Sequence, residues 1–419
     1  MQELNQKTAI VLGGTHDHIT LLQILAQKGY RTVLVDYFEN PPAKAYADHF
    51  VRESTLDKEK VLQISREMHA NVVIATCIDQ ALLTMSFVCE ELGLPCHINY
   101  NQALNLTNKA YMKKVFLENG IPSSPYVILE ESDDPIAVQQ TAKYPLVVKP
   151  ADSNSSKGIR RVDNDSELTA AVADAFTFSR SKKVVVEGFV DGLELSVDVV
   201  IKNGDAHIIM VSQNLKNSNF TDSFTIVQNT FYKQLYEKYK DMLTVIATNI
   251  AKAFKISNGP MLIQLLAEGD SLSVIEFSSR IGGGSKHSFI RTIAGFDMLG
   301  YFVDLITGGD NPVDTSYPYR YGAMNYIYTR PGKIGKFEGF DHLKTQQIIS
   351  DYFFYKTEGM EITNNISSAD RPAGYMVVDD DLSRINQKIR QADAMLRVFD
   401  TDGSDMMNHG LHTGLVSFS

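Results

Sequence analysis

The segment VIEFSSRIGGG, residues 274–284, places an acid and a base four residues apart at the end of an apolar run. Glu276 interrupts the hydrophobic pattern, Arg280 follows two serines, and three glycines come next. A carboxylate suits Mg²⁺, which takes one or two protein carboxylates and completes its shell with phosphates and water. A guanidinium offers a rigid fork to a phosphate or a carboxylate. The pair therefore indicates a metal and phosphate site, and a salt bridge between Glu276 and Arg280 is the alternative.

A second oxygen donor, Gln264, lies on the apolar run that precedes this segment. Residues 261–277 read MLIQLLAEGDSLSVIEF, two apolar runs separated by a Gly-Asp-Ser turn, and this pattern predicts a β-hairpin. If the two strands pair, the side chains of Gln264 and Glu276 can face the same side of the hairpin. Mg²⁺ is bound by oxygen atoms that converge in this way.

Lys149 ends the apolar run YPLVVKP, residues 144–150, and is followed by the small polar loop ADSNSSKG, residues 151–158. Hydroxyls, backbone amides and lysines together suit phosphate oxygens. A plain surface loop is the alternative. The phosphate-binding candidates of this loop are Ser153, Ser155, Ser156, Lys157 and Gly158.

Two acids flank the turn in VVVEGFVDGLELS, residues 184–196. Glu187 follows three valines, and Glu194 lies seven residues further on. On either side of a strand connection, two carboxylates could hold the amine edge of a base and the hydroxyls of a ribose. The alternative is a pair of hairpin-end acids in water.

The first hundred residues alternate short apolar runs with helical patterns, which predicts a parallel sheet with helices on both faces. The glycine turn GGTHDH after the first strand, and Asp36 after the second, would suit a dinucleotide as in an oxidoreductase. However, the third glycine of that motif is absent. The expected strands are residues 8–14, 31–37 and 71–77, and the expected helices are residues 18–29, 58–70 and 80–93.

From about residue 105 the pattern changes to antiparallel sheet mixed with helices. Thr107 is a candidate cap for a helix over residues 108–120. A long helix is expected near residues 232–255. After a polar, linker-like stretch at residues 308–318, the last hundred residues combine short strands with a helix at residues 381–396.

The bulk composition limits the classes of function. A chain of 419 residues predicts two to three domains. A net charge of −10 argues against a general electrostatic grip on nucleic acid or on an anionic membrane. The three cysteines lack metal-ligand spacing, and no signal peptide or membrane-length apolar run is visible. We therefore expect a cytoplasmic protein with neither nucleic acid nor a membrane as partner.

The order of these features resembles that of the ATP-grasp superfamily. The likeness is greatest to its carboxylate–amine ligases, with carbamoyl-phosphate-synthetase-like and biotin-carboxylase-like members. NPPAKAYADHF at residues 40–50 is similar to the family's segment after the second strand, and NKAYMKKVFLENGIP at residues 108–122 to its entry helix. The resemblance covers nearly the whole chain and implies an α/β and α+β fold. The implied parts are a Rossmann-like preATP-grasp domain (1–105), an ATP-grasp domain of two α+β subdomains (106–308) with a mobile lid at about 125–190, and a small C-terminal α+β lobe (309–419).

The resemblance also implies roles for the candidate residues. Arg280 would stabilise the transferred phosphoryl group, and Lys149 would take part in catalysis. The family's metal signature E-[IVLM]-N-P-R reads EFSSR here, so Ser278 stands where an asparagine is usual. The implied positions for Mg²⁺ (or Mn²⁺) are Gln264, Glu276 and Ser278, and those for ATP are Lys109, Lys149, Ser153, Ser155, Ser156, Lys157, Gly158, Glu187, Val190 and Glu194.

The implied activity is ATP-dependent ligation, in which a carboxylate is activated as an acyl phosphate with formation of ADP and is then joined to an amine. The substrates would be small molecules, such as amino acids or other metabolites. His287 and Arg291, which follow the glycine run, are candidates to contact them, and surface or helix-cap roles are the alternative for both. Many members of the family are dimers, so a homodimer is one expectation. Two alternatives stay open: a nucleotide-dependent oxidoreductase that uses the first domain, and a non-catalytic ATP-binding regulatory module, which the EFSSR departure favours.

Overall fold

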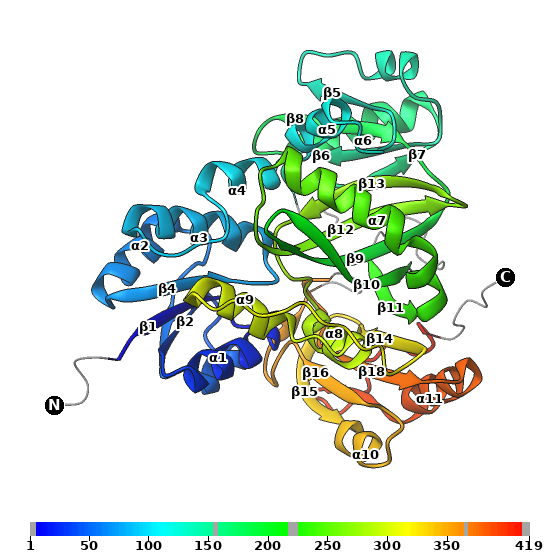
Figure 1. Ribbon diagram of the computed structural model, residues 1–419. Coiled ribbons are helices and arrows are strands. Elements are labelled where there is room, and N and C mark those ends of the chain that lie inside the picture. Colours follow the sequence, from blue (N-terminus) through cyan, green and yellow to red (C-terminus); the bar gives the residue numbers. More distant parts are fainter. Residues whose placement is uncertain (1–5, 154–157, 217–224, 364–367, 413–419) are drawn as a thin grey trace.

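The computed structural model describes residues 6–153, 158–216, 225–363 and 368–412. Figure 1 shows a blue N-terminal sheet on one side, a small sheet at the top, and a large sheet in the middle that continues toward the C-terminus. The mixed α/β and α+β class predicted from the sequence is confirmed. No helix in these ranges is long and apolar enough to cross a membrane.

The N-terminal sheet is built from β1 (Thr8–Leu12), β2 (Arg31–Asp36), β3 (His49–Arg52) and β4 (Ala70–Ala75), with helices α1 (Asp17–Gln27), α2 (Lys58–Glu67), α3 (Asp79–Leu92) and α4 (Tyr100–Leu106). Its strand order is β3-β2-β1-β4, and every pair is parallel, as predicted. The central strand β1 is buried along its whole length, which is typical of a sheet covered on both faces. The carboxylate of Asp48 accepts hydrogen bonds from the backbone N–H of Thr32 (2.8 Å) and from its hydroxyl (3.0 Å), which ties the start of β3 to β2.

The small sheet is antiparallel and consists of β5 (Tyr126–Glu130), β6 (Leu146–Pro150), β7 (Arg160–Val162) and β8 (Lys183–Gly188), in the order β5-β8-β6-β7. Helix α6 (Asp165–Phe178) packs on it around a core of its own. The alternative of two hairpin-end acids is wrong, because β8 pairs with β5 and β6 and not with the strand that follows it. Glu187 and Glu194 therefore belong to different sheets.

The large sheet has the order β13-β12-β9-β10-β11-β14-β18-β16, and all of its pairs are antiparallel. Helix α7 (Lys233–Ala253) packs into the core on one face, and α8 (Lys286–Ala294) and α9 (Met298–Thr307) into the core on the other. The strands are β9 (Leu193–Lys202), β10 (Asp205–Lys216), β11 (Ile226–Tyr232), β12 (Gly259–Glu268), β13 (Ser271–Ser278), β14 (Tyr321–Ile327), β16 (Asp351–Phe354) and β18 (Ala373–Asp379).

Strand β9 shows how the large sheet carries both a core and a site. Leu195, Val197 and Val199 are fully buried in the core that includes α7. Glu194 and Ser196, which alternate with them, line a cavity. Successive side chains of a strand point to opposite faces, so one strand can contribute to both.

The hairpin predicted over residues 261–277 is confirmed. Strands β12 and β13 pair in antiparallel fashion, and Gln264 lies directly opposite Glu276. Their side chains therefore leave the hairpin on the same face.

The large sheet extends into the C-terminal residues. Strands β14, β18 and β16 lengthen it beyond β11, and β11 pairs with β14 over five residue pairs from Gln228↔Asn325 to Tyr232↔Tyr321. The predicted boundary between residues 308 and 309 falls between α9 and β14, so the hydrogen bonds of one sheet join its two sides. The other C-terminal elements, orange to red in Figure 1, are β15 (Gly332–Glu338), β17 (Glu361–Ile362), β19 (Arg397–Asp400), α10 (Phe340–Thr345) and α11 (Leu382–Met395).

Helix α5 (Lys109–Glu118) is capped by Asn108, so the prediction of Thr107 as its cap is wrong. The Asn108 side chain accepts a hydrogen bond from the backbone N–H of Tyr111 at 3.0 Å. Thr107 instead ends helix α4, and its hydroxyl donates to the carbonyl of Ala103 at 3.1 Å.

Asn108→Ala should lower the free energy of unfolding by about 1 kcal/mol, because it removes the acceptor for one otherwise unpaired N–H group of the first helical turn. Urea denaturation followed by circular dichroism measures the change. Thr107→Ala is the matched control and should have the smaller effect. The assignment of the cap is contradicted if Thr107→Ala destabilises the protein more than Asn108→Ala does.

Candidate active site

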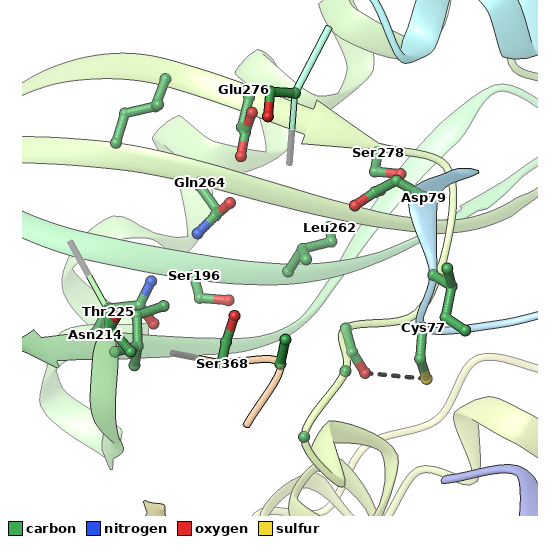
Figure 2. A pocket seen from close by; sticks show the side chains of 18 of the residues that line it. Cys77, Asp79, Ser196, Asn214, Thr225, Leu262, Gln264, Glu276, Ser278 and Ser368 are labelled. Atoms are coloured by element: carbon green, nitrogen blue, oxygen red, sulfur yellow. Dashed lines mark hydrogen bonds between the residues drawn. The ribbon is translucent and has the colours of Figure 1, made fainter. Parts of the chain in front are cut away.

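A cavity of about 1160 Å³ lies where the small sheet, the large sheet and the N-terminal domain meet. Its lining includes Lys149 and Glu187 from the small sheet and Gln264 and Glu276 from the large sheet. Figure 2 shows part of this lining, with the side chains of Gln264 and Glu276 directed into the same space. The cavity exceeds the roughly 300–1,000 Å³ of a typical small-molecule site, so it can hold two ligands side by side.

Two lysines share the carboxylate of Glu187 at the small-sheet side of the cavity. Lys149 pairs with Glu187 from the neighbouring strand β6, and Lys113 pairs with it from α5 at 2.6 Å. All three side chains are buried. Burial by itself would raise the pKa of Glu187, but the two ammonium groups outweigh this effect and the pKa lies below its ordinary value. Two cations against one anion leave a net positive charge beside the cavity, which suits an anionic ligand.

The side chain of Lys113 is buried, and burial disfavours its charged form. Burial lowers its pKa from 10.5 to about 8, although the charge of Glu187 acts in the opposite direction. The ammonium also donates to the Ser123 hydroxyl at 2.5 Å and to the carbonyl of Val274 at 3.3 Å. These contacts join α5 to strand β13 and hold the amine in position.

A chain of hydrogen bonds crosses the cavity-facing side of the large sheet. Glu194 pairs with Lys216 at 2.5 Å and accepts a hydrogen bond from the Asn214 amide at 2.9 Å. Asn214 in turn accepts from the Asn229 amide at 2.5 Å, and Asn229 accepts from the Tyr326 hydroxyl at 2.7 Å. The chain therefore fixes polar side chains on four neighbouring strands, from β9 to β14.

Gln264, Glu276 and Ser278 are the residues predicted to supply oxygens to a metal ion. Lys109 lies 3.2 Å from the Glu276 carboxylate and donates to the carbonyl of Ser153 at 2.7 Å. Ser278 lies further along β13, beside Asp79 (Figure 2). The described ranges contain no group of three or more His, Cys, Asp or Glu side chains that could hold a metal ion. One carboxylate and one amide fit Mg²⁺ if a phosphate ligand supplies further oxygens.

Arg280 forms a two-pronged ion pair with Asp79, the first residue of α3. Its Nε lies 2.5 Å from Oδ1 and its Nη2 lies 2.6 Å from Oδ2. Burial would raise the pKa of Asp79, but the guanidinium reverses this effect and keeps the pKa below its ordinary value. The structure thus gives Arg280 a carboxylate partner in the N-terminal domain that the sequence did not indicate, at the wall of the same cavity.

A second buried ion pair lies under the glycine run. Lys286 Nζ is 3.4 Å from Asp198 Oδ2 and donates to the Ser212 hydroxyl at 2.6 Å. Burial raises the pKa of Asp198 and lowers that of Lys286, and each partner opposes the effect on the other. A methyl group on Gly282 would come within 3.0 Å of the Lys286 side chain, so glycine lets the loop pass directly over the pair.

Of the remaining residues predicted to bind ATP, some lie within the described part of the chain and some do not. Ser153 and Val190 line the cavity, and Gly158 adopts a left-handed backbone with φ +72°. Ser155, Ser156 and Lys157 lie outside the described residues, and nothing follows for their role.

The two predicted substrate contacts, His287 and Arg291, do not line the cavity. His287 is buried, and its Nδ1 lies 3.4 Å from Asp17 Oδ1. Arg291 is exposed and pairs with Asp297 at 2.7 Å. Their contact with substrate therefore stays a prediction, and the lining of this cavity gives it no support.

Sequence reasoning missed Lys113, Asp79 and Arg371. A signal was available for Lys113, because it lies three residues from the buried Ala110 and three from the buried Phe116, on the apolar face of α5. A lysine at such a position needs a partner. Asp79 and Arg371 reach the cavity from distant parts of the chain, and no local pattern marks them.

Comparison with known proteins gives matches to parts of the chain. A family model described as the D-ala D-ala ligase C-terminus matches residues 115–258. The D-alanine–D-alanine ligase of Lactococcus lactis subsp. cremoris (strain SK11) is 30% identical over 167 residues, which are 38% of this chain and 47% of that enzyme. The phosphoribosylamine–glycine ligase of Helicobacter pylori is 25% identical over 277 residues, 64% of this chain and 63% of that enzyme. The chain thus covers less than two thirds of the length of each relative.

Solved structures match nearly the whole chain. An L-amino acid ligase from Bacillus licheniformis has a TM-score of 0.76 at 19% identity, covering 94% of this chain and 99% of that one. The biotin carboxylase domain of the Hydrogenobacter thermophilus 2-oxoglutarate carboxylase has a TM-score of 0.78 at 15% identity, covering 94% and 91%. The chain therefore has the ATP-grasp fold.

The ATP-grasp fold does not favour the oxidoreductase alternative for this chain. The Hydrogenobacter thermophilus structure is a domain dimer in complex with MgADP, ADP and bicarbonate. Structures of N5-carboxyaminoimidazole ribonucleotide synthetases, also similar in fold, hold ADP. Each of these three structures thus contains ADP, and the Hydrogenobacter thermophilus structure also contains magnesium.

Lys113→Met should remove a specific part of the pH dependence of stability. The pKa of Lys113 is about 8 in the folded protein against an ordinary 10.5, so between these values the unfolded chain binds more protons. Stability then rises with pH in that window. Relative to Lys113→Met, the free energy of unfolding of the wild type should rise by roughly 3 kcal/mol from pH 8 to pH 10.5.

Urea denaturation at several pH values measures this rise. Lys114→Met, which removes the exposed neighbouring lysine, is the control and should keep the wild-type profile. A wild-type profile in Lys113→Met would show that the buried amine does not titrate as we state.

Proposed function

We propose that this ATP-grasp protein is an ADP-forming ligase that activates a carboxylate as an acyl phosphate and joins it to an amine. The observation that carries the proposal is the composition of one cavity wall. Lys109 and Lys149, which suit phosphate, line the same cavity as Gln264 and Glu276, which suit Mg²⁺. Arg280 lines it as well, and the volume leaves room for a second molecule beside a nucleotide.

The nucleotide would lie between the small sheet and the large sheet. The net positive charge of the cluster of Lys113, Lys149 and Glu187 would face its phosphates. Glu194 would accept hydrogen bonds from the ribose hydroxyls, since it is already fixed in orientation by Lys216 and Asn214. Val190 lies on the segment between the sheets, where backbone groups would meet the adenine.

The chemistry requires that a poor electrophile be made reactive. A carboxylate oxygen would attack the γ-phosphorus of ATP, the bond to the β-phosphate oxygen would break, and ADP would leave with the electron pair. The amine would then attack the acyl carbon, phosphate would leave with the electrons of the carbon–oxygen bond, and the amine would lose a proton. Bound to Glu276 and Gln264, Mg²⁺ would neutralise phosphate charge that otherwise repels the anionic nucleophile.

The residues of this chain would position the groups and exclude water. Lys109 and Lys149 would hold phosphate oxygens in line with the attacking carboxylate. The acyl phosphate is hydrolysed easily, so a cavity enclosed by two sheets and the N-terminal domain favours the amine over water. Names of the relatives, including D-alanine–D-alanine ligase and L-amino acid ligase, support amino acids or similar small metabolites as substrates.

Incubation with Mg-ATP, hydroxylamine and pools of carboxylic acids tests the proposal directly. Hydroxylamine captures acyl phosphates, so formation of hydroxamate together with ADP is the expected result. Formation of AMP would contradict the acyl-phosphate route. Stabilisation by ATP without turnover on any pool would favour the non-catalytic ATP-binding module.

Glu276→Ala should lower the rate of hydroxamate formation at least about 100-fold, because it removes the carboxylate of the proposed magnesium site. Thermal denaturation checks that the variant stays folded. Glu268→Ala, an exposed acid near the turn of the same hairpin, is the matched control and should keep the wild-type rate. An active Glu276→Ala variant would show that the metal assignment is wrong.

A further inference from the structure

Arg371 is a cation at the cavity wall, and no acid among the described residues forms an ion pair with it. Its guanidinium lies 3.9 Å from the centroid of the Tyr326 ring and 5.6 Å from that of Tyr355. Within the described part of the chain, no carboxylate forms an ion pair with it, and its Nε atom has no hydrogen-bond partner. The adjacent Asp370 pairs with Lys356 instead, at 3.5 Å. The negative charge of Asp17 also attracts the Arg371 guanidinium. However, the Asp17 carboxylate already accepts hydrogen bonds from the backbone N–H groups of Gly284 and Ser285.

Such an arrangement favours an anionic ligand. A guanidinium held partly out of water loses hydration, and stacking on an aromatic ring offsets only part of that loss. A carboxylate can engage two N–H groups of the guanidinium at once, which adds both energy and orientation. The buried hydroxyl of Tyr326 is fixed by its bond to Asn229, so the platform beneath the guanidinium is rigid.

The position of Arg371 connects it to the reaction site. A methyl group on Gly284 would lie 2.6 Å from Arg371 Nη1 and 2.9 Å from the Tyr326 ring. Gly284 has φ +72°, so glycine is favoured there both for its backbone and for the close approach. The glycine run that begins two residues after Arg280 thus passes directly against Arg371. An anion on Arg371 would lie beside that run.

The same end of the cavity has an apolar wall that includes exposed side chains. Tyr37 and Leu56 are 59% and 51% exposed, and both line the cavity with Phe38 and Met360. The rings of Tyr37 and Phe38 lie 4.0 Å apart. Lys356, which lies 5.7 Å from the Phe38 ring, also pairs with Asp370, so the apolar wall and Arg371 are neighbours.

We propose that this end of the cavity binds a substrate that has a carboxylate and a bulky apolar body. Arg371 holds the carboxylate, and Tyr37, Phe38, Leu56 and Met360 contact the body. The inference deepens the proposed function, on which it rests for the reaction, but substrate binding can be measured without turnover. It names a binding residue in the C-terminal part of the chain, whereas the nucleotide would contact the two sheets.

Two acid and amide pairs with the same apolar body test the proposal. Isothermal titration in the presence of MgADP measures binding of 3-phenylpropionate against 3-phenylpropanamide, and of L-phenylalanine against L-phenylalaninamide. The wild type should bind at least one acid 10-fold or more tightly than its amide. Propionate, which lacks the aromatic body, should bind more weakly than 3-phenylpropionate.

Arg371→Met should lose at least 10-fold in affinity for the acid and should no longer distinguish it from the amide. Arg371→Lys keeps the positive charge but loses the two-pronged guanidinium. Its affinity for the acid should therefore lie between those of the wild type and Arg371→Met. Leu56→Ala should weaken acid and amide to the same degree. The affinity for MgADP should stay within about 2-fold in all variants, and Arg390→Met, an exposed arginine of α11, should behave as the wild type.

The proposal is overturned if Arg371→Met distinguishes acid from amide as the wild type does, or if the wild type binds neither acid. These outcomes are separate from a failure of the proposed function. Loss of hydroxamate formation with intact acid–amide discrimination would contradict the ligase reaction and leave the Arg371 site standing. Hydroxamate formation without discrimination between acid and amide would support the ligase reaction and contradict the Arg371 site.

Discussion

The alternation of side chains along β9 is the constraint on which the site depends. Leu195, Val197 and Val199 are fixed in the core with α7, so Glu194 and Ser196 must face the cavity. A shift of one residue would bury the acid and expose three large apolar groups, which excludes other registers. Strands β10 and β12 pair with β9 in this register and so acquire their own orientation from it. The placement of Gln264 opposite Ser196 and Glu276 follows from the same hydrogen-bond ladder.

Several charged groups around the cavity are matched by an opposite charge, in contrast to Arg371. Glu187 is shared by two lysines, Arg280 is matched by Asp79, and Lys286 by Asp198. Removing charges from water is expensive, and partners at hydrogen-bond distance offset that expense only when their geometry is fixed. The ion pairs also connect different elements: they join α5 to the small sheet, the segment after β13 to α3 of the N-terminal domain, and α8 to β9.

Much of the fold could be predicted because it depends on local sequence patterns. Parallel strands in the first hundred residues, the Gln264–Glu276 hairpin and the long helix α7 follow from apolar periodicity and turn residues. Contacts that join distant segments could not be predicted in this way. Arg280 and Asp79 are 201 positions apart in the sequence, and no local pattern around either residue indicates that they pair. His287 and Arg291 do not line the cavity, which shows that proximity in sequence to the glycine run is not enough to place a side chain there.

The continuity of the large sheet across residue 308 limits how the chain could be divided or recombined. The segment before that position ends its sheet at β11, and β14 covers the edge of β11 with a full ladder of hydrogen bonds. A fragment that stopped at α9 would present an open strand edge, which invites pairing with other chains. Exchange of C-terminal segments between relatives would have to preserve the β11–β14 register as well as the lobe itself. Differences among such proteins are therefore expected mainly in the loops, whereas the strands that join the two halves should be retained together.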